Sequence, residues 1–281
     1  MNWEKSKTVM IVMLLLTNAF LLGFAYLNSP AYTVSGDQYA AIMSVLQKNG
    51  VTMTADFIKD SPPMPSLTLY AGSLNAGDIC GVFFGAAAGV TDAGNGVYTL
   101  GSAGLMVSGD GFVYNNPEGL GAGSGCDSVI KSLSPYLPGF ARDKTGVSAR
   151  GGPVDNTVTY RQIYKNYMIY SNYVTFTVSN NGIIRAECSY NPPAFFGKAR
   201  GGICSPDAAA FAFLRRAKTL YNGDQINISG MELLYCVPQS DGGAQGRAGQ
   251  AATITAAPFY RFSVSGKADS VLVNAYTGLA Q

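Results

Sequence analysis

The stretch TVMIVMLLLTNAFLLGFAYL, from Thr8 to Leu27, holds twenty residues without a charged side chain. As an α-helix with a rise of about 1.5 Å per residue it would extend about 30 Å, the thickness of a bilayer's hydrocarbon core. Lys5 and Lys7 precede it, and no basic residue follows before Lys48. Because basic residues mark the cytoplasmic side, the sequence predicts a single-pass transmembrane helix over 8–27, with residues 1–7 in the cytoplasm and an extracellular domain after it.

A cleaved signal peptide and a buried soluble helix are the two alternatives for this stretch. A signal peptide has a shorter apolar region, of about 7–15 residues, and a small-x-small cleavage site. The nearby Ser29-Pro30-Ala31 contains a proline, which makes it a poor site. A buried helix of a soluble protein would carry a polar stripe, whereas only Thr8, Thr17 and Asn18 are polar here. The uncleaved membrane anchor is therefore the favoured interpretation.

The composition excludes several classes of function. The chain has no histidine, so Ser-His-Asp and Cys-His nucleophiles and histidine-containing zinc sites are excluded. The net charge is only +2 and no run of basic residues occurs, so the sequence gives no indication of nucleic-acid binding. We therefore expect no enzymatic activity, no cofactor and no metal. The cysteines lack any CxxC pair, and their burial as free thiols or their pairing in one or two disulfides both stay open. They are Cys80, Cys126, Cys188, Cys204 and Cys236.

The first half of the chain beyond residue 28 contains one clear helix signal. Ser35 and Gln38 have the spacing of a capping box, and Ile42 and Leu46 lie on one apolar face of the helix that ends near Gly50. Strands are predicted over Val51–Phe57 and Leu67–Tyr70. Residues 72–125 are rich in glycine and read as short strands, among them Gly81–Phe84 and Gly111–Tyr114. A helix over Asp127–Leu137 and a polar linker over 142–156 follow.

The second half has clearer patterns. Alternating apolar residues before and after Asn180-Asn181-Gly182 predict a β-hairpin, because this tripeptide favours a tight turn. Ser205-Pro206-Asp207 predicts the start of a helix, with Gly223 at its end. Strands are then expected over 226–237, 258–265 and 270–276, with a loop at 240–252. The fold class is α+β: an antiparallel sheet with a few packed helices, divided into subdomains over 28–150 and 151–281.

Several motifs resemble those of the YycI (WalI) family. The opening Met1-Asn2-Trp3-Glu4-Lys5-Ser6-Lys7, followed by an apolar helix that contains Asn18, is similar to the start of that family. So are Tyr170-Ser-Asn-Tyr173 and Pro258-Phe-Tyr-Arg-Phe262, and the closing Val273-Asn-Ala-Tyr-Thr-Gly278 also resembles the broader PepSY-like modules. The likeness covers residues 1–50 and 158–281. Residues 72–125 are richer in glycine and alanine than the family pattern, and Asn2 stands where the family usually has aspartate.

The resemblance implies regulation without chemistry. YycI-type proteins are accessory membrane proteins of the WalK/WalR two-component system, which controls cell-wall metabolism in Gram-positive bacteria. The implied partners are the WalK-type sensor histidine kinase and a YycH-type membrane protein. Asn18 is the leading candidate for a hydrogen bond to a partner helix, and a bond within its own helix is the alternative. Thr17, Gly23 and Trp3 complete the predicted partner interface.

Three further classes of protein compete with this interpretation. A PepSY-like inhibitor or chaperone of an extracellular enzyme would share the architecture. A carboxylate-based surface hydrolase needs no histidine, and the glycine-rich half holds Asp78, Asp92, Asp110, Glu118 and Asp127. A pilin-like subunit would need a glutamate inside the apolar helix, which this chain lacks.

Overall fold

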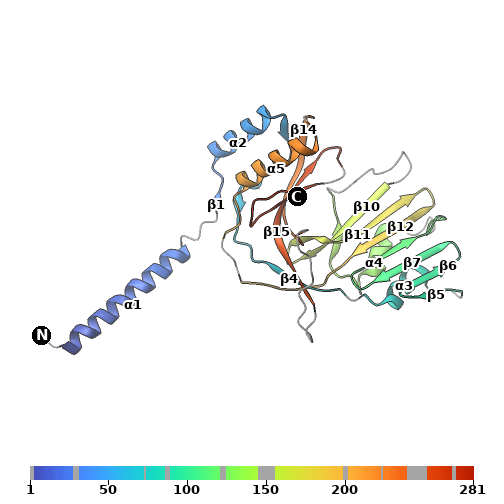
Figure 1. Cartoon of the computed structure of the whole chain (residues 1–281), viewed down its shortest axis with the longest axis horizontal. Helices are drawn as coiled ribbons and strands as arrows, with labels where there is room; N and C mark the ends of the chain where they lie inside the picture. The colour runs from blue at the N-terminus through green and yellow to red at the C-terminus, as the bar shows by residue number, and fades with distance from the viewer. Residues whose placement is uncertain are drawn as a thin grey trace.

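The computed structural model is an α+β protein with one isolated helix (Figure 1). It describes residues 3–27, 32–72, 74–85, 89–120, 125–144, 156–198, 202–222, 224–238, 252–267 and 270–281, without the side chains of residues 4–6, 22–27 and 32. Nearly all of the predicted loop at 240–252, most of the linker at 142–156 and the helix stop at Gly223 lie outside the described residues.

Helix α1 (Trp3–Leu27) projects away from the rest of the molecule (Figure 1). Its described apolar side chains are between 49% and 74% exposed, counting residues 9–16, Phe20 and Leu21. Among the described residues, no helix is long and apolar enough to cross a membrane.

The prediction of a transmembrane helix over 8–27 is therefore wrong. The location derived from it was a single-pass protein of the cell membrane with a cytoplasmic N-terminus and an extracellular domain. That location is corrected too, because no described helix could cross a membrane.

The strands form one extended sheet and one small two-stranded sheet. In the extended sheet ten strands follow one another in the order β13-β4-β15-β14-β11-β12-β8-β7-β6-β5, with β2, β9, β10 and β16 attached beside them. The bounds are β1 (Tyr32–Thr33), β2 (Val51–Met53), β3 (Asp60–Ser61), β4 (Leu67–Tyr70), β5 (Thr91–Gly94), β6 (Val97–Leu100), β7 (Ala103–Ser108), β8 (Gly111–Asn115), β9 (Phe140–Arg142), β10 (Asn156–Tyr164), β11 (Tyr167–Ser179), β12 (Gly182–Ser189), β13 (Pro193–Phe196), β14 (Ile226–Cys236), β15 (Thr253–Val264) and β16 (Val271–Asn274).

Two helices begin where their capping residues predict. Ser35 caps α2 (Gly36–Lys48) in a full capping box with Gln38, and Pro206 opens α5 (Pro206–Leu220) behind Ser205. Asn75 caps α3 (Ala76–Phe84) by accepting hydrogen bonds from the backbone of Gly77 and Asp78. α4 runs over Cys126–Leu133. The capping box and the Ser-Pro start were therefore reliable signals.

Two large hydrophobic cores share the sheet, and one is nested inside the other along the chain. The first core takes its side chains from residues 34–69 and 203–275, together with Ile169, and α2 and α5 cover its strands. The second core takes its side chains from residues 79–190, with α3 and α4 on its strands. Figure 1 shows the two groups of elements side by side. The middle of the chain thus forms one core, and its two flanks meet to form the other.

Some expectations about the elements differ from the structure. Gly81–Phe84 belongs to α3 rather than to a strand, because the Asn75 cap starts a helix five residues earlier. The strand predicted over Val51–Phe57 is only Val51–Met53, and the sheet is not wholly antiparallel. β14 pairs in parallel with β2 and with β11, because both of these strands reach it from distant parts of the chain. The predicted hairpin is confirmed as β11–β12.

Candidate functional site

The hairpin of β10 and β11 spans both cores and carries a large bulge. Arg161 pairs with Tyr173, but the next residue, Gln162, pairs with Ile169. Residues 170–172 of β11 therefore have no register partner on β10 and bulge out of the ladder. These residues belong to the Tyr170-Ser-Asn-Tyr173 motif, so the motif builds the irregular part of the hairpin at the boundary between the cores.

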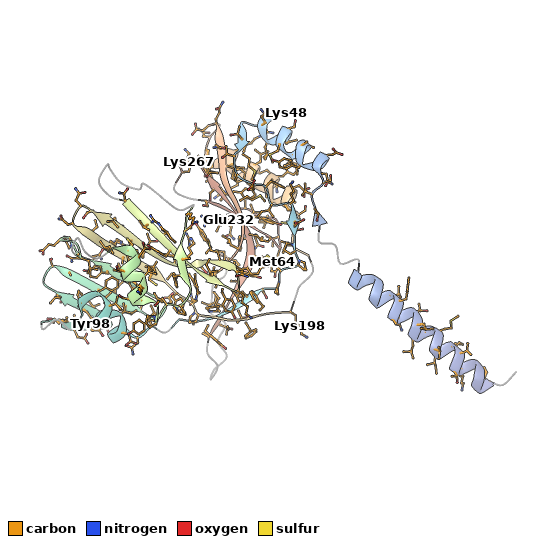
Figure 2. All side chains as sticks on the ribbon, turned by 180° about the vertical axis from the view of Figure 1, so that it is seen from behind. Lys48, Met64, Tyr98, Lys198, Glu232 and Lys267 are labelled. Atoms are coloured by element: carbon orange, nitrogen blue, oxygen red, sulfur yellow. The ribbon has the colours of Figure 1, made fainter. Side chains whose placement is uncertain are left out.

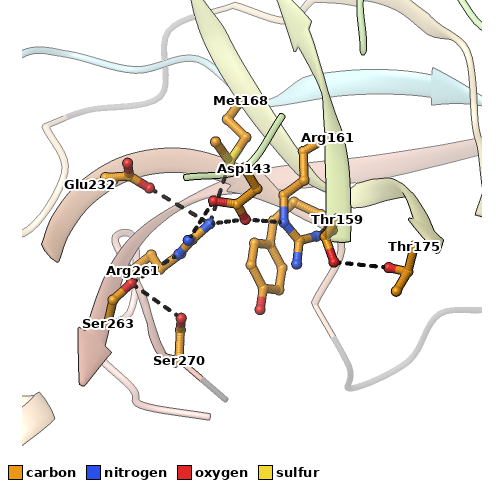
Figure 3. Close-up of polar contacts among 10 residues, drawn as sticks. Asp143, Thr159, Arg161, Met168, Thr175, Glu232, Arg261, Ser263 and Ser270 are labelled. Carbon is orange, nitrogen blue, oxygen red and sulfur yellow. Dashed lines mark hydrogen bonds and ion pairs between the residues drawn. The ribbon is translucent and has the colours of Figure 1, made fainter. Parts of the chain in front are cut away.

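Next to this bulge one buried carboxylate holds two guanidinium groups (Figure 3). Asp143 follows β9, and its backbone N–H donates to the carbonyl of Thr159. Arg161 donates from Nε to Asp143 Oδ2 over 2.9 Å. Arg261, on β15, donates from Nη1 to Oδ2 over 2.9 Å and from Nη2 to Oδ1 over 3.0 Å. The Asp143 and Arg261 side chains are each 1% exposed, so this ion pair is removed from water.

A second carboxylate stands close to Arg261. Glu232 lies opposite Arg261 in the register of β14 and β15. Its Oε2 is 3.7 Å from Arg261 Nη1, is buried, and has no hydrogen-bond partner among the described residues. We call Asp143, Arg161, Glu232 and Arg261 the junction cluster. Its two positive and two negative charges balance, and Glu232 lies between the two groups of strands (Figure 2).

Aromatic and sulfur groups line the same place. The Arg161 guanidinium carbon is 3.6 Å from the centre of the Tyr170 ring, and that of Arg261 is 5.4 Å from it. Arg161 Nη1 also donates to the Tyr170 carbonyl, and Arg261 Nη1 lies 3.6 Å from the Met168 sulfur. Cation–π contacts of this kind stabilise buried guanidinium groups. The start of β11 thus holds both arginines in place.

A buried network of amides lies beside the junction cluster. Asn172 is fully buried and donates from Nδ2 to Gln162 Oε1 and to the Asn191 carbonyl, both over 2.7 Å. In return its Oδ1 accepts from the Asn191 backbone N–H over 3.2 Å. Gln162 donates to Pro138, and Asn191 Oδ1 accepts from Gly72. The network ties the bulge to the segments that lead from one core to the other.

The residues predicted as a partner interface lie on α1. Trp3 and Asn18 are exposed, and Thr17 donates its hydroxyl to the Met13 carbonyl over 2.8 Å. At 3.6 residues per turn, Trp3, Thr17 and Asn18 fall within an arc of about 100°. Gly23 is part of α1 but lies outside the described side chains. The structure keeps these residues on one helix, apart from the junction cluster.

Three of the five acids considered for a hydrolase accept hydrogen bonds from neighbouring groups. Asp92 accepts from the N–H of Gly94, and Asp110 accepts from the Ser108 hydroxyl. Asp127 accepts from the Tyr160 hydroxyl over 2.5 Å and, with Cys126 and Arg142, lines an open pocket of about 410 Å³. Among the described residues, no group of three or more acidic or cysteine side chains could hold a metal ion.

All five cysteines are free thiols. Burial raises the pKa of Cys236 to about 11 and raises the pKa of Cys188 further. Desolvation likewise raises the pKa of the three half-buried thiols, Cys80, Cys126 and Cys204. Since the thiolate is the reactive form, these sites hold the sulfurs in their inert form at neutral pH.

Comparisons with known proteins give limited results. No family model matches the chain, and no curated protein matches its sequence significantly. The fold has a partial likeness to a crystal structure of an uncharacterized protein from Eubacterium rectale ATCC 33656, with 10% identity, a TM-score of 0.48 and coverage of 86% of this chain and 98% of that one. It has a further likeness to YycH from Bacillus subtilis, with 13% identity, a TM-score of 0.46 and coverage of 80% of this chain and 57% of that one. Scores below 0.5 at such identities do not assign a function.

The junction cluster was missed in the sequence, although one signal was present. Arg261 is the single charged residue in the strand Thr253–Val264, where its neighbours are apolar. A lone arginine in such a strand indicates a buried charge, which requires a partner. The partner itself could not be predicted, because Asp143 lies 118 residues away in the chain.

Proposed function

We propose that this chain is a non-enzymatic accessory protein that associates with a sensor histidine kinase of the WalK type and with a YycH-type protein, and so modulates signalling by that kinase. The choice of partners rests on the resemblance of residues 1–7, 170–173, 258–262 and 273–278 to the YycI family. Modulation requires only that the chain binds one state of the kinase better than another.

The observation that carries the proposal is the surface of α1. Its described apolar residues are exposed along 9–16 and at Phe20 and Leu21. A continuous exposed apolar surface of this size marks an interaction site. We assign its occupant as an apolar helix of the kinase. Asn18 is the polar group on this surface that can bond across such a contact and set its register, as a single buried asparagine does between paired helices.

The motifs that resemble the YycI family have structural roles in the sheet-containing part of the chain that follows α1. Tyr170 of the second motif contacts both arginines of the junction cluster, and Arg261 of the third motif is a member of that cluster. In the last motif, Asn274 Oδ1 accepts from the N–H groups of Tyr276 and Thr277, which closes the turn after β16. These motif residues support a scaffold, which agrees with a role in binding rather than in catalysis.

Photo-crosslinking in cells tests the proposal. Benzoylphenylalanine at Thr17 should crosslink to a sensor histidine kinase, whereas the same group at Tyr98, at the far end of the molecule (Figure 2), should not. Capture in neutral detergent then measures the role of Asn18. Asn18→Leu should reduce recovery of the kinase about fivefold, as expected for the loss of about 1 kcal/mol from one hydrogen bond.

The control is Leu16→Ile, which keeps the apolar character of an exposed position on the same helix. It should leave recovery of the kinase unchanged. Equal recovery with Asn18→Leu would remove Asn18 from the interface. If Thr17 gave no crosslink to a kinase, or if an extracellular enzyme were crosslinked instead, the proposed partner would be wrong.

A further inference from the structure

Each core contributes its own acid and its own arginine to the junction cluster. Asp143 directly follows β9 and Arg161 lies on β10; Arg161 pairs with Ala141, and the Asp143 N–H donates to the Thr159 carbonyl. Glu232 and Arg261 face each other across β14 and β15, in the sheet of the first core. The shortest contacts of Arg261 nevertheless cross to Asp143, at 2.9 and 3.0 Å, while Glu232 stays 3.7 Å away.

The ladder that joins the two parts of the extended sheet is very short near the junction cluster. β11 and β14 connect the two parts of the extended sheet, and their ladder is the single parallel pair of Ile169 and Tyr235. On either side the ladders are long, with eight register pairs between β14 and β15 and seven between β11 and β12. A single pair resists rotation of one part against the other far less than these ladders do. The Asp143–Arg261 ion pair therefore adds a restraint where the sheet is weakest.

We propose that Arg261 exchanges Asp143 for Glu232 as its carboxylate partner, so that the junction cluster is a latch that holds the two cores together and releases them without leaving a charge unpaired. In the held form Arg261 bridges the cores. In the released form each core keeps its own pair, Asp143 with Arg161 and Glu232 with Arg261.

The charges explain why such an exchange is accessible. Opening a buried ion pair normally leaves two uncompensated charges, which is strongly unfavourable. Here Asp143 retains its 2.9 Å contact with Arg161. Glu232 Oε2 accepts no hydrogen bond from the described part of the chain, and a shift of about 0.8 Å would give it the separation from Arg261 that Asp143 now has. The Glu232 side chain is also 39% exposed, so water can stabilise the released pair.

Exchange between two discrete pairings is the kind of two-state element that a binding partner can bias. The latch is a property of this chain alone and goes beyond the proposed function, because it holds whichever partner binds.

A native thiol reports on the latch. Cys236 is buried with Leu234 and Phe259 in a small third cluster, and Met168 and Tyr170, which contact the two arginines, pack against that cluster. Release of the latch therefore exposes Cys236. Cys188 is buried in the second core and reports on unfolding of that core. The rates at which N-ethylmaleimide alkylates the two thiols in the full chain, read by peptide mass spectrometry, separate local release from unfolding.

Glu232→Gln is the decisive variant. It removes the negative charge of the acceptor and so weakens the bond to Arg261 in the released form; alkylation of Cys236 should therefore slow about tenfold, while the rate at Cys188 stays unchanged. The factor corresponds to the difference between a charge-assisted and a neutral hydrogen bond. Glu187→Gln is the control, because Glu187 forms an exposed ion pair with Arg185 on β12, and it should alter neither rate.

A static cluster predicts the opposite sign. If Glu232 only steadies Arg261 in the observed arrangement, Glu232→Gln would leave the Cys236 rate unchanged or raise it, and the exchange would be disproved. Asp143→Asn should raise the Cys236 rate at least tenfold. If that variant unfolds, alkylation of Cys188 will accelerate equally, and the test then depends on Glu232→Gln.

Discussion

Arg261 and Asp143 are 118 residues apart in the chain and meet through two buried hydrogen bonds of 2.9 and 3.0 Å. Arg161 uses the same carboxylate, so Asp143 neutralises two guanidinium groups at once. Removing Asp143 and removing one of the arginines should therefore have different effects on stability. Removal of the acid takes the carboxylate partner from Arg161 and leaves Arg261 with Glu232 at 3.7 Å, whereas removal of Arg261 leaves an acid that is still paired.

This asymmetry gives the first prediction. Asp143→Asn should lower the free energy of unfolding by about 3–5 kcal/mol, the usual loss when one partner of a buried ion pair is removed. Arg261→Met should cost less, because Asp143 keeps Arg161. Urea unfolding followed by circular dichroism measures both values. Equal losses, or a larger loss for Arg261→Met, would contradict the shared role of Asp143.

The amide network gives the second prediction. Asn172→Leu removes the partner of Gln162 Oε1 and both partners of the Asn191 backbone groups. Each buried polar group left unsatisfied costs about 1–3 kcal/mol, so we expect a loss of about 3 kcal/mol or more in urea unfolding. Asn115→Leu, at an exposed position on β8, should change stability by less than about 0.5 kcal/mol. Similar losses in the two variants would rule out the network as a source of stability.

Close approach of two strands gives the third prediction. A Cβ atom at Gly111 would lie 2.1 Å from the Cys188 carbonyl oxygen, so β8 and β12 would have to separate. Gly111→Ala should destabilise the fold by about 1–3 kcal/mol. Gly104→Ala, on the adjacent β7, meets nothing within 4 Å and should stabilise the fold by about 0.4–1 kcal/mol through the unfolded chain. Thermal unfolding of both variants checks the opposite signs.

The buried thiols give the fourth prediction. Burial raises the pKa of Cys236 from 9.0 to about 11. Between these values the unfolded chain loses the proton and the folded chain keeps it, so the unfolded state binds fewer protons and stability falls as the pH rises. Below about pH 8 the thiol adds no pH dependence.

Cys236→Ala should therefore reduce the fall by up to about 1.4 kcal/mol per pH unit between pH 9 and 11, as measured by urea unfolding across that range. The control is Leu234→Ala, in the same cluster. It should lower stability at every pH and leave the slope unchanged. An unaltered slope for Cys236→Ala would show that this thiol does not couple folding to pH.

The sequence predicted the elements that local signals define. The capping box at Ser35 and Gln38, the Ser205-Pro206 start and the Asn180-Asn181-Gly182 turn each depend on a few neighbouring residues, and each is confirmed. Other elements have no such local signal. The turn of the β10–β11 hairpin has positive φ at Lys165 and Asn166, with no glycine to indicate it.

The junction cluster could not be predicted, because its parts come from four strands or strand ends distributed over more than a hundred residues. Sequence patterns show that Arg261 is a charge among apolar neighbours, but only the pairing of β14 with β15 and the path of β9 bring Glu232 and Asp143 to it. The predicted interface on Trp3, Thr17, Asn18 and Gly23 stays a prediction.

The nesting of one core inside the other sets an order for folding during synthesis. Residues 79–190 leave the ribosome as one continuous block, so the second core can form as soon as they emerge. Leu67 and Leu69 are made earlier, yet β4 pairs with β15, whose strand begins at Thr253. They can pair with β13 once Pro193–Phe196 are made, but for nearly two hundred residues of translation they lack their neighbours on β15. A chain shortened before β15 would therefore keep its middle and expose both of its flanks.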